Sequence, residues 1–238
     1  IYEFKRNTIF NCAPPIKDGG LRIGIPRILT IYENFPFWEN LFRHSGFEVV
    51  LSNESTTKLY EKGSGTIMSD NICFPAKLSH GHIFDLAEQG VDRIFYPFIL
   101  FEKEEFNQAH NCYNCPIVTA YSEVLQNIKT GIPLDSPAFS FKNEKLLKKA
   151  CVNYLTSLSV PKRTAEKAFE KAQQAQLQNK EAIRRKNLDI LAKAKAQHTP
   201  VILLAGHPYH TDPLIHQKIS DILSDLGVCV INEEVSAE

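Results

Sequence analysis

Short apolar runs alternate with helical stretches along this chain of 238 residues, and this alternation constrains the fold more than any other feature of the sequence. Residues 21–25 form an apolar run that Pro26 ends, and residues 32–45 place large apolar side chains at helical spacing. Gly46 is typical of a helix end, and residues 47–51 form the next apolar run. This order of strand, helix and strand predicts an α/β fold of Rossmann-like lobes with mainly parallel sheets.

The alternation continues further along the chain. A turn-rich stretch through Gly63 and Gly65 leads to a predicted helix over residues 74–89, which has a proline in its first turn. Residues 91–96 and 116–120 are apolar and rich in β-branched side chains, so they are interpreted as two further strands. A short helix is expected after the second of them. These elements complete the first predicted lobe.

Residues 143–198 are rich in Ala, Lys, Gln and Glu and contain no strand signal, so they predict two helices divided near Pro161. A helix continuous over residues 161–198 would extend roughly 57 Å at ~1.5 Å per residue, so it either bends or bridges two lobes. Residues 161–198 include ten Lys or Arg and four Asp or Glu, which gives a local charge of +6. Two interpretations remain open: a solvated helix face, or a docking surface for an anionic partner.

A second α/β unit begins after Pro200, because residues 201–205 and 228–231 read as strands and residues 213–226 as a helix between them. The chain begins with Ile1 rather than Met and ends in a predicted strand, so we expect a fragment of a longer polypeptide. The predicted organisation is a leader (1–20), a first Rossmann-like lobe (21–142), a helical linker (143–199) and the start of a truncated second lobe (200–238).

Charge and hydropathy exclude several classes of partner. Lys and Arg together number 27, and so do Asp and Glu, so no global field attracts nucleic acid or an anionic membrane. No run approaches the ~20 apolar residues needed to span a bilayer, and the start of the chain lacks the pattern of a secretion signal. We therefore expect a cytoplasmic protein that binds neither nucleic acid nor membrane.

Cys73 is the first candidate ligand. It stands just before the predicted helix that Pro75 begins, and the partial positive charge of a helix N-terminus favours a thiolate over a thiol. Lys77, one turn further on, would strengthen this effect and is also a candidate for binding a substrate or an anion. The alternative is that Cys73 is a small buried apolar residue.

Cys112 and Cys115 form a C-x-x-C pair in the loop before the predicted strand 116–120. One such pair is a weak signal for zinc, and a thioredoxin-like motif would begin a helix rather than a strand. Iron–sulfur clusters accept thiolates from separate loops, which fits Cys73 with Cys115, and with Cys112 as a further candidate. The remaining cysteines are predicted to be structural: Cys12, Cys151 and Cys229.

Two groups of histidines are candidates for binding a substrate or an anion. His82 lies with His80 on the predicted helix 74–89, where a structural or surface role is the competing interpretation. His207 and His210 follow the first strand of the second unit, at the position where α/β proteins bind their ligands. Neither a Walker A sequence, nor a dinucleotide fingerprint, nor a G-x-S-x-G elbow is present.

Several short motifs together resemble one family, the acyl-CoA dehydratase activase-related domain, which occurs in large proteins beside the ATPase that activates (R)-2-hydroxyacyl-CoA dehydratases. The motifs span most of the chain from residue 21 onward: Gly24–Arg27, Tyr32–Trp38, Ser69–Lys77 with Gly81 and His82, Tyr113–Pro116, and Gly206–His210. The family is similar to the dehydratase subunits, in which cysteines from Rossmann-like lobes hold a [4Fe-4S] cluster. The resemblance implies that Cys73 and Cys115 are cluster ligands and that their thiols converge at the mouth of the first sheet.

The resemblance implies an iron–sulfur accessory or electron-transfer module of an ATP-dependent activation system. Its expected partners are an ATPase domain in the same long chain, a dehydratase-like protein and an acyl-CoA. The segment carries no ATPase motif of its own. One alternative is a zinc- or CoA-binding scaffold that docks a partner through the basic helix, where Arg184 and Arg185 lie. Direct catalysis of dehydration is a further alternative, for which the sequence identifies no acid–base pair.

Overall fold

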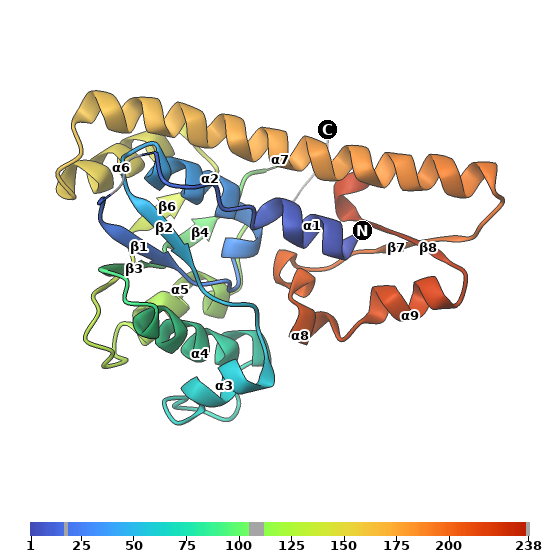
Figure 1. The fold of residues 1–238 in the computed structure, drawn as a ribbon, viewed down its shortest axis with the longest axis horizontal. Helices are drawn as coiled ribbons and strands as arrows, with labels where there is room; N and C mark the ends of the chain where they lie inside the picture. Colours follow the sequence, from blue (N-terminus) through green and yellow to red (C-terminus); the bar gives the residue numbers. More distant parts are fainter. Residues whose placement is uncertain (17–18, 105–111, 237–238) are drawn as a thin grey trace.

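A computed structural model describes residues 1–16, 19–104 and 112–236 (Figure 1). Its helices are α1 (Tyr2–Ile9), α2 (Ile31–Arg43), α3 (Thr57–Ser64), α4 (Phe74–Glu88), α5 (Pro116–Leu125), α6 (Glu144–Ser157), α7 (Lys162–Ala196), α8 (Pro213–His216) and α9 (Ile219–Asp225), with short 3-10 helices η1 (Pro208–Thr211) and η2 (Glu233–Ser236). Its strands are β1 (Arg22–Ile25), β2 (Glu48–Leu51), β3 (Arg93–Phe95), β4 (Phe98–Phe101), β5 (Leu134–Asp135), β6 (Ala138–Ser140), β7 (Val201–Leu204) and β8 (Cys229–Asn232).

The central sheet is parallel throughout, with the strand order β2-β1-β3-β5. Two further pairs, β4 with β6 and β7 with β8, are also parallel. Helices α2 and α6 lie on one side of the central sheet, and α4 and α5 lie on the other (Figure 1). The structure thus confirms an α/β fold with parallel sheets.

The core is built around the aromatic face of α2. Phe35, Trp38 and Phe42 are fully buried, as the helical spacing of the sequence predicts. The Trp38 ring packs against Phe95 of β3 and Phe139 of β6, with ring centroids 5.0 and 4.9 Å away. Burial of such large rings is the main stabilising contribution in an interior of this kind.

Helix α7 bridges the molecule. It is one helix of 35 residues, roughly 52 Å long, and it follows α6 after a break at Pro161, as predicted. It packs against α2 and α6 near its start and against α1, β8 and η2 further along (Figure 1). Near its C-terminal end Asn187 donates to Asn232 Oδ1 at 2.6 Å and accepts from the Asn232 backbone N–H at 3.0 Å. The boundaries of the four predicted segments stay a prediction.

Gln176 clamps α7 to α2. Its Nε2 donates to the Glu33 carbonyl at 2.8 Å, and its Oε1 accepts from the Phe37 N–H at 3.2 Å. This contact lies beside Pro36, which has no N–H to donate within α2. Gln176 therefore bonds to the α2 backbone at the turn where proline removes one helical donor.

Replacing Gln176 by alanine is expected to lower the free energy of unfolding by about 1–2 kcal/mol, since two half-buried hydrogen bonds to backbone are lost. Urea denaturation followed by circular dichroism measures this difference. Gln174→Ala, at an exposed position of the same helix, is the matched control and should change stability little. Equal stability of the two variants would contradict the clamping role.

Residues 116–120 are not a strand, and this prediction was wrong. They open helix α5, for which Cys115 is the N-cap residue with an extended backbone (φ −64°, ψ 153°) and Pro116 occupies the first turn. The Cys115 Sγ accepts the backbone N–H of Val118 at 3.4 Å. A proline after a capping residue favours a helix start more strongly than the β-branched residues behind it favour a strand. The expectation that the C-x-x-C pair does not precede a helix is corrected with it.

Other differences have local causes. The turn-rich stretch contains α3, which packs so closely on α4 that a Cβ on Gly63 would lie 2.3 Å from the Gly81 nitrogen. The predicted helix 213–226 is divided into α8 and α9, because Gln217 and Lys218 have left-handed backbones. The predicted leader 1–20 contains α1, in which the buried Lys5 pairs with Glu233 at 2.7 Å and Glu234 at 3.3 Å.

None of the described helices is both long enough and apolar enough to cross a membrane. Arg184 and Arg185 both lie near Glu181 of α7, at 3.7 and 3.6 Å, and the Arg185 side chain is 73% exposed. Docking of a partner on this face of α7 stays a prediction.

Candidate functional site

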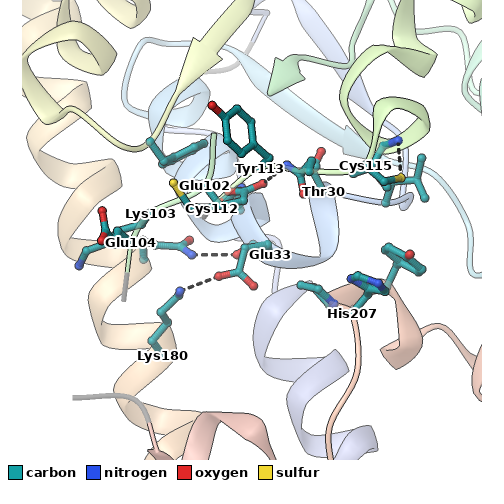
Figure 2. Close-up of a pocket in the computed structure, with 18 of the residues that line it drawn as sticks. Thr30, Glu33, Glu102, Lys103, Glu104, Cys112, Tyr113, Cys115, Lys180 and His207 are labelled. Carbon is teal, nitrogen blue, oxygen red and sulfur yellow. Dashed lines mark hydrogen bonds and ion pairs between the residues drawn. The ribbon is translucent and has the colours of Figure 1, made fainter. Parts of the chain in front are cut away.

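A pocket of about 380 Å³ lies where α2, α5 and α7 meet the loops after several strands (Figure 2). Thr30, Glu102 and His207 line it, and they follow the carboxyl ends of β1, β4 and β7 in turn. Parallel α/β sheets collect their ligands at this end of the strands. The pocket therefore stands where the sequence pattern predicts a binding site.

Cys73 and Cys115 are the N-cap residues of α4 and α5, two helices in contact with each other. Both thiols are exposed to solvent. Each is followed by a proline in the first turn of its helix, but only the Cys115 side chain accepts a backbone N–H there. Cys115 lines the pocket, whereas Cys73 is not among the lining residues.

Two tyrosines lie within electrostatic reach of both thiols. Burial raises the pKa of Tyr209, and the charges of Cys115 and Cys73 raise it further. Burial likewise raises the pKa of Tyr96, with smaller effects from Tyr121, Cys115 and Cys73. The Tyr96 hydroxyl is buried and has no hydrogen-bond partner among the described residues. Both tyrosines therefore interact electrostatically with Cys73 and with Cys115.

Cys112 lines the same pocket and is partly buried. Its carbonyl accepts the Glu102 backbone N–H at 2.9 Å. Figure 2 shows Cys112 and Glu102 on one side of the pocket and Cys115 and His207 on the other. The two cysteines of the C-x-x-C pair thus occupy different parts of one cavity.

Glu102 is the most perturbed carboxyl of the pocket. Burial raises the pKa of Glu102 to about 7, against the lowering effect of the hydrogen bond from Asn114; nearby Glu33 raises it further. Asn114 Nδ2 donates to Oε1 at 2.8 Å, and Asn34 Nδ2 donates to Oε2 at 3.0 Å. A carboxyl with a strongly raised pKa in a pocket is a candidate functional group.

Thr30 forms part of the pocket wall. It occupies the N-cap position of α2, yet its hydroxyl caps no backbone N–H. The residue is only 4% exposed, and its Oγ1 has no hydrogen-bond partner among the described residues. The preceding residue, Leu29, has a φ of 41°, a left-handed conformation that is rare for leucine and is often found at functional sites.

His207 and His210 come together in the turn after β7. The His207 ring stacks on Tyr209 with centroids 5.1 Å apart, and the His210 ring lies 5.6 Å from that of His207. Burial lowers the pKa of His210, and His207 lowers it further. Gly206 makes this packing possible, because a Cβ there would lie 2.4 Å from His210 Nδ1. His207 and Tyr209 line the pocket, whereas His210 is not a lining residue and packs edge-on against both rings.

Two other predicted candidates lie outside the pocket. His82 is fully buried, and its Nδ1 and Nε2 are hydrogen-bonded to Ser52 and Ser55 at 2.8 and 2.9 Å. Both ring nitrogens therefore have partners within the chain. Lys77 donates to the Asp70 carbonyl at 2.9 Å, which ties the loop before α4 to the first turns of that helix.

The described residues supply only part of the ligand set that a metal ion or an iron–sulfur cluster would need. Within residues 1–16, 19–104 and 112–236, no three His, Cys, Asp or Glu side chains are grouped so that they could hold a metal ion. Cys73 and Cys115 supply two thiols, whereas a [4Fe-4S] cluster takes about four ligands.

Sequence reasoning missed Glu102, Thr30 and the ion pair between Glu33 and Lys180, whose charged atoms lie 2.6 Å apart. Glu102 directly follows the apolar run of β4, so recognition of that strand would have identified it. Thr30 has the residue type of an ordinary helix cap, and its sequence carries no signal of another role.

The fold and the pocket define the class: an α/β protein with parallel sheets and a candidate ligand site at the carboxyl ends of its strands. The chain belongs to the family described as CoA enzyme activase uncharacterised domain (DUF2229), whose model matches residues 22–235. The membership expected from the sequence motifs is thereby confirmed, and the family name links the domain to CoA enzyme activase systems. Comparisons with curated proteins and with solved structures found no match.

Proposed function

We propose that this domain contributes Cys73 and Cys115 to an iron–sulfur centre and serves as an accessory or electron-transfer module of an ATP-dependent (R)-2-hydroxyacyl-CoA dehydratase activation system. The observation that carries the proposal is the matched position of the two cysteines, each exposed at the N-terminus of one of two contacting helices. Both also lie within electrostatic reach of Tyr96 and Tyr209.

The physical reason is the preference of a helix N-terminus for negative charge. Thiolates and an anionic cluster are both favoured by the partial positive charge of that end. Cys115 Sγ already accepts a backbone N–H at 3.4 Å, an interaction that tunes sulfur ligands in such centres. When bound, an iron–sulfur centre stores one electron and passes it on. The remaining ligands would come from outside the described residues.

The partners follow from the family link. The proposed ones are an ATPase domain of the same long chain, a 2-hydroxyacyl-CoA dehydratase-like protein and an acyl-CoA. The pocket beside Cys115 offers a place where a small group of such a partner or substrate could approach the thiol.

Anaerobic purification of the full-length protein, followed by iron and sulfide analysis after reconstitution, tests the proposal. We expect bound iron and sulfide with visible absorbance, and most of the iron should be lost in Cys73→Ser and in Cys115→Ser. Cys12→Ser, at another exposed cysteine, is the matched control and should retain it. A colourless, iron-free wild type, or a Cys73→Ser protein with wild-type iron content, would remove the proposal. Zinc at about one equivalent without visible absorbance would favour the scaffold alternative.

A further inference from the structure

The pocket contains a partly buried carboxyl group whose direct partners among the described residues are neutral. Glu102 receives hydrogen bonds from two neutral amides, and none of the Lys, Arg or His side chains that the structure describes forms an ion pair with it. A partly buried carboxylate that lacks a paired counter-charge is unfavourable, and a bound cation offsets that cost.

The charges of α2 and α7 oppose each other at Glu102. Lys180 of α7 favours an ionised Glu102, whereas Glu33 of α2, with which Lys180 forms an ion pair at 2.6 Å, acts unfavourably on it. The other charged groups in the lining are Lys103 and Glu104, both exposed at the rim. The three carboxyl groups of the lining outnumber its two lysines, so the pocket favours a positive ligand over a negative one.

The hydrogen-bonding atoms that remain near Glu102 can all act as acceptors. Asn114 Nδ2 donates to Glu102 and to the Ile99 carbonyl, so both of its protons are used and its Oδ1 is left. Thr30 is a lining residue, and its buried hydroxyl has no partner among the described residues. Each of these oxygens can accept a proton from a ligand, as can the Glu102 carboxylate. An ammonium group, which has three donors, matches this set.

The rest of the lining suits an apolar body. Tyr113, Tyr209 and Phe141 provide aromatic rings, and Leu29 and Val118 provide aliphatic side chains. Aromatic faces attract cations, which adds to the preference for a positive ligand. The volume of about 380 Å³ is at the lower end of the range for small-molecule sites.

We propose that this pocket binds a small organic cation, a protonated amine on an apolar body, whose ammonium group pairs with Glu102 and donates to Thr30. This binding site goes beyond the iron–sulfur proposal and requires no metal chemistry. Its specificity comes from charge, because an isosteric alcohol or carboxylate lacks the positive nitrogen.

Titration of the full-length protein with benzylamine, benzyl alcohol and benzoate, followed by isothermal calorimetry or ligand-observed NMR at pH 7.5, tests the proposal. We expect benzylamine to bind about tenfold or more tightly than benzyl alcohol, since a charge-assisted hydrogen bond contributes that much. Benzoate should not compete. Equal binding of the three compounds, stronger binding of benzoate, or no binding of benzylamine would overturn the proposal.

Two variants locate the interaction. Glu102→Gln should weaken benzylamine binding about tenfold or more, whereas Glu104→Gln, at the exposed rim, should change it little. Thr30→Val, nearly isosteric, should weaken benzylamine binding without loss of stability, because the hydroxyl has no partner to lose. The Thr30→Val variant tests the assignment independently if Glu102→Gln folds poorly. Unchanged affinity in Glu102→Gln or in Thr30→Val would contradict the assignment.

Discussion

Replacing Asp212 by alanine is expected to lower the free energy of unfolding by about 3–5 kcal/mol. Asp212 is 1% exposed and accepts four hydrogen bonds. Its Oδ2 accepts from Tyr32 Oη at 2.6 Å and from Ser55 Oγ, and its Oδ1 caps the first turn of α8 through two backbone N–H groups at 2.8 and 3.2 Å. Removing the carboxylate leaves these buried donors without an acceptor, which is more costly than the loss of an exposed bond.

Urea denaturation measures this effect, with Asp225→Ala as the control at an exposed position on α9. The Asp212 partners Tyr32 and Ser55 belong to the first part of the chain, so the carboxylate ties the residues after β7 to α2 and to the loop after β2. A loss below about 1 kcal/mol would show that water replaces the missing acceptor and that this tie contributes little.

The second large effect is a loss of stability at acidic pH that originates from His82. Burial lowers the pKa of His82 to about 3, against the opposing effect of Asp85. In the unfolded chain a histidine has a pKa near ~6.5, so between pH ~6.5 and ~3 the unfolded state binds a proton that the folded state does not. Stability contributed by the neutral ring is fully present above pH ~6.5 and falls by about 1.4 kcal/mol per pH unit below it, or about 2 kcal/mol at pH 5.

The comparison of wild type with His82→Gln isolates this contribution. The stability difference between the two proteins should shrink by about 2 kcal/mol when the pH is lowered from 7.5 to 5. His198→Gln, at an exposed histidine, provides the control and should follow the wild type across the range. A constant difference between wild type and His82→Gln would mean that the buried ring takes up its proton without unfolding.

The main helices and strands could be predicted because their patterns agree with their environment. The apolar run at 21–25 and the amphipathic stretch at 32–45 lead to β1 and α2, whose apolar residues are buried as the pattern requires. The predictions failed where a cap competes with side-chain shape. Pro116 begins a helix although valine and threonine follow it, and the short strands β5 and β6 have too few residues to show a period.

Part of the candidate site was visible in the sequence. Cys73 before a helix and His207 after a strand are local patterns, and the structure puts both at those positions. Glu102 could not be recognised in this way. Its environment is made by Asn34 and Asn114, and neither residue is its neighbour in sequence. The raised pKa of such a carboxyl depends on the folded surroundings and leaves no trace in composition.

The length of α7 couples two distant parts of the molecule mechanically. An uninterrupted helix acts as a stiff rod, and this one is fastened to α2 through Gln176 and to β8 through Asn187. Tilting the rod to follow a displaced β8 would draw Lys180 and Gln176 away from Glu33, at the edge of the pocket. Force applied to the C-terminal strands thus reaches the Lys180–Glu33 ion pair through the stretch of α7 between Asn187 and Lys180, roughly 10 Å of helix.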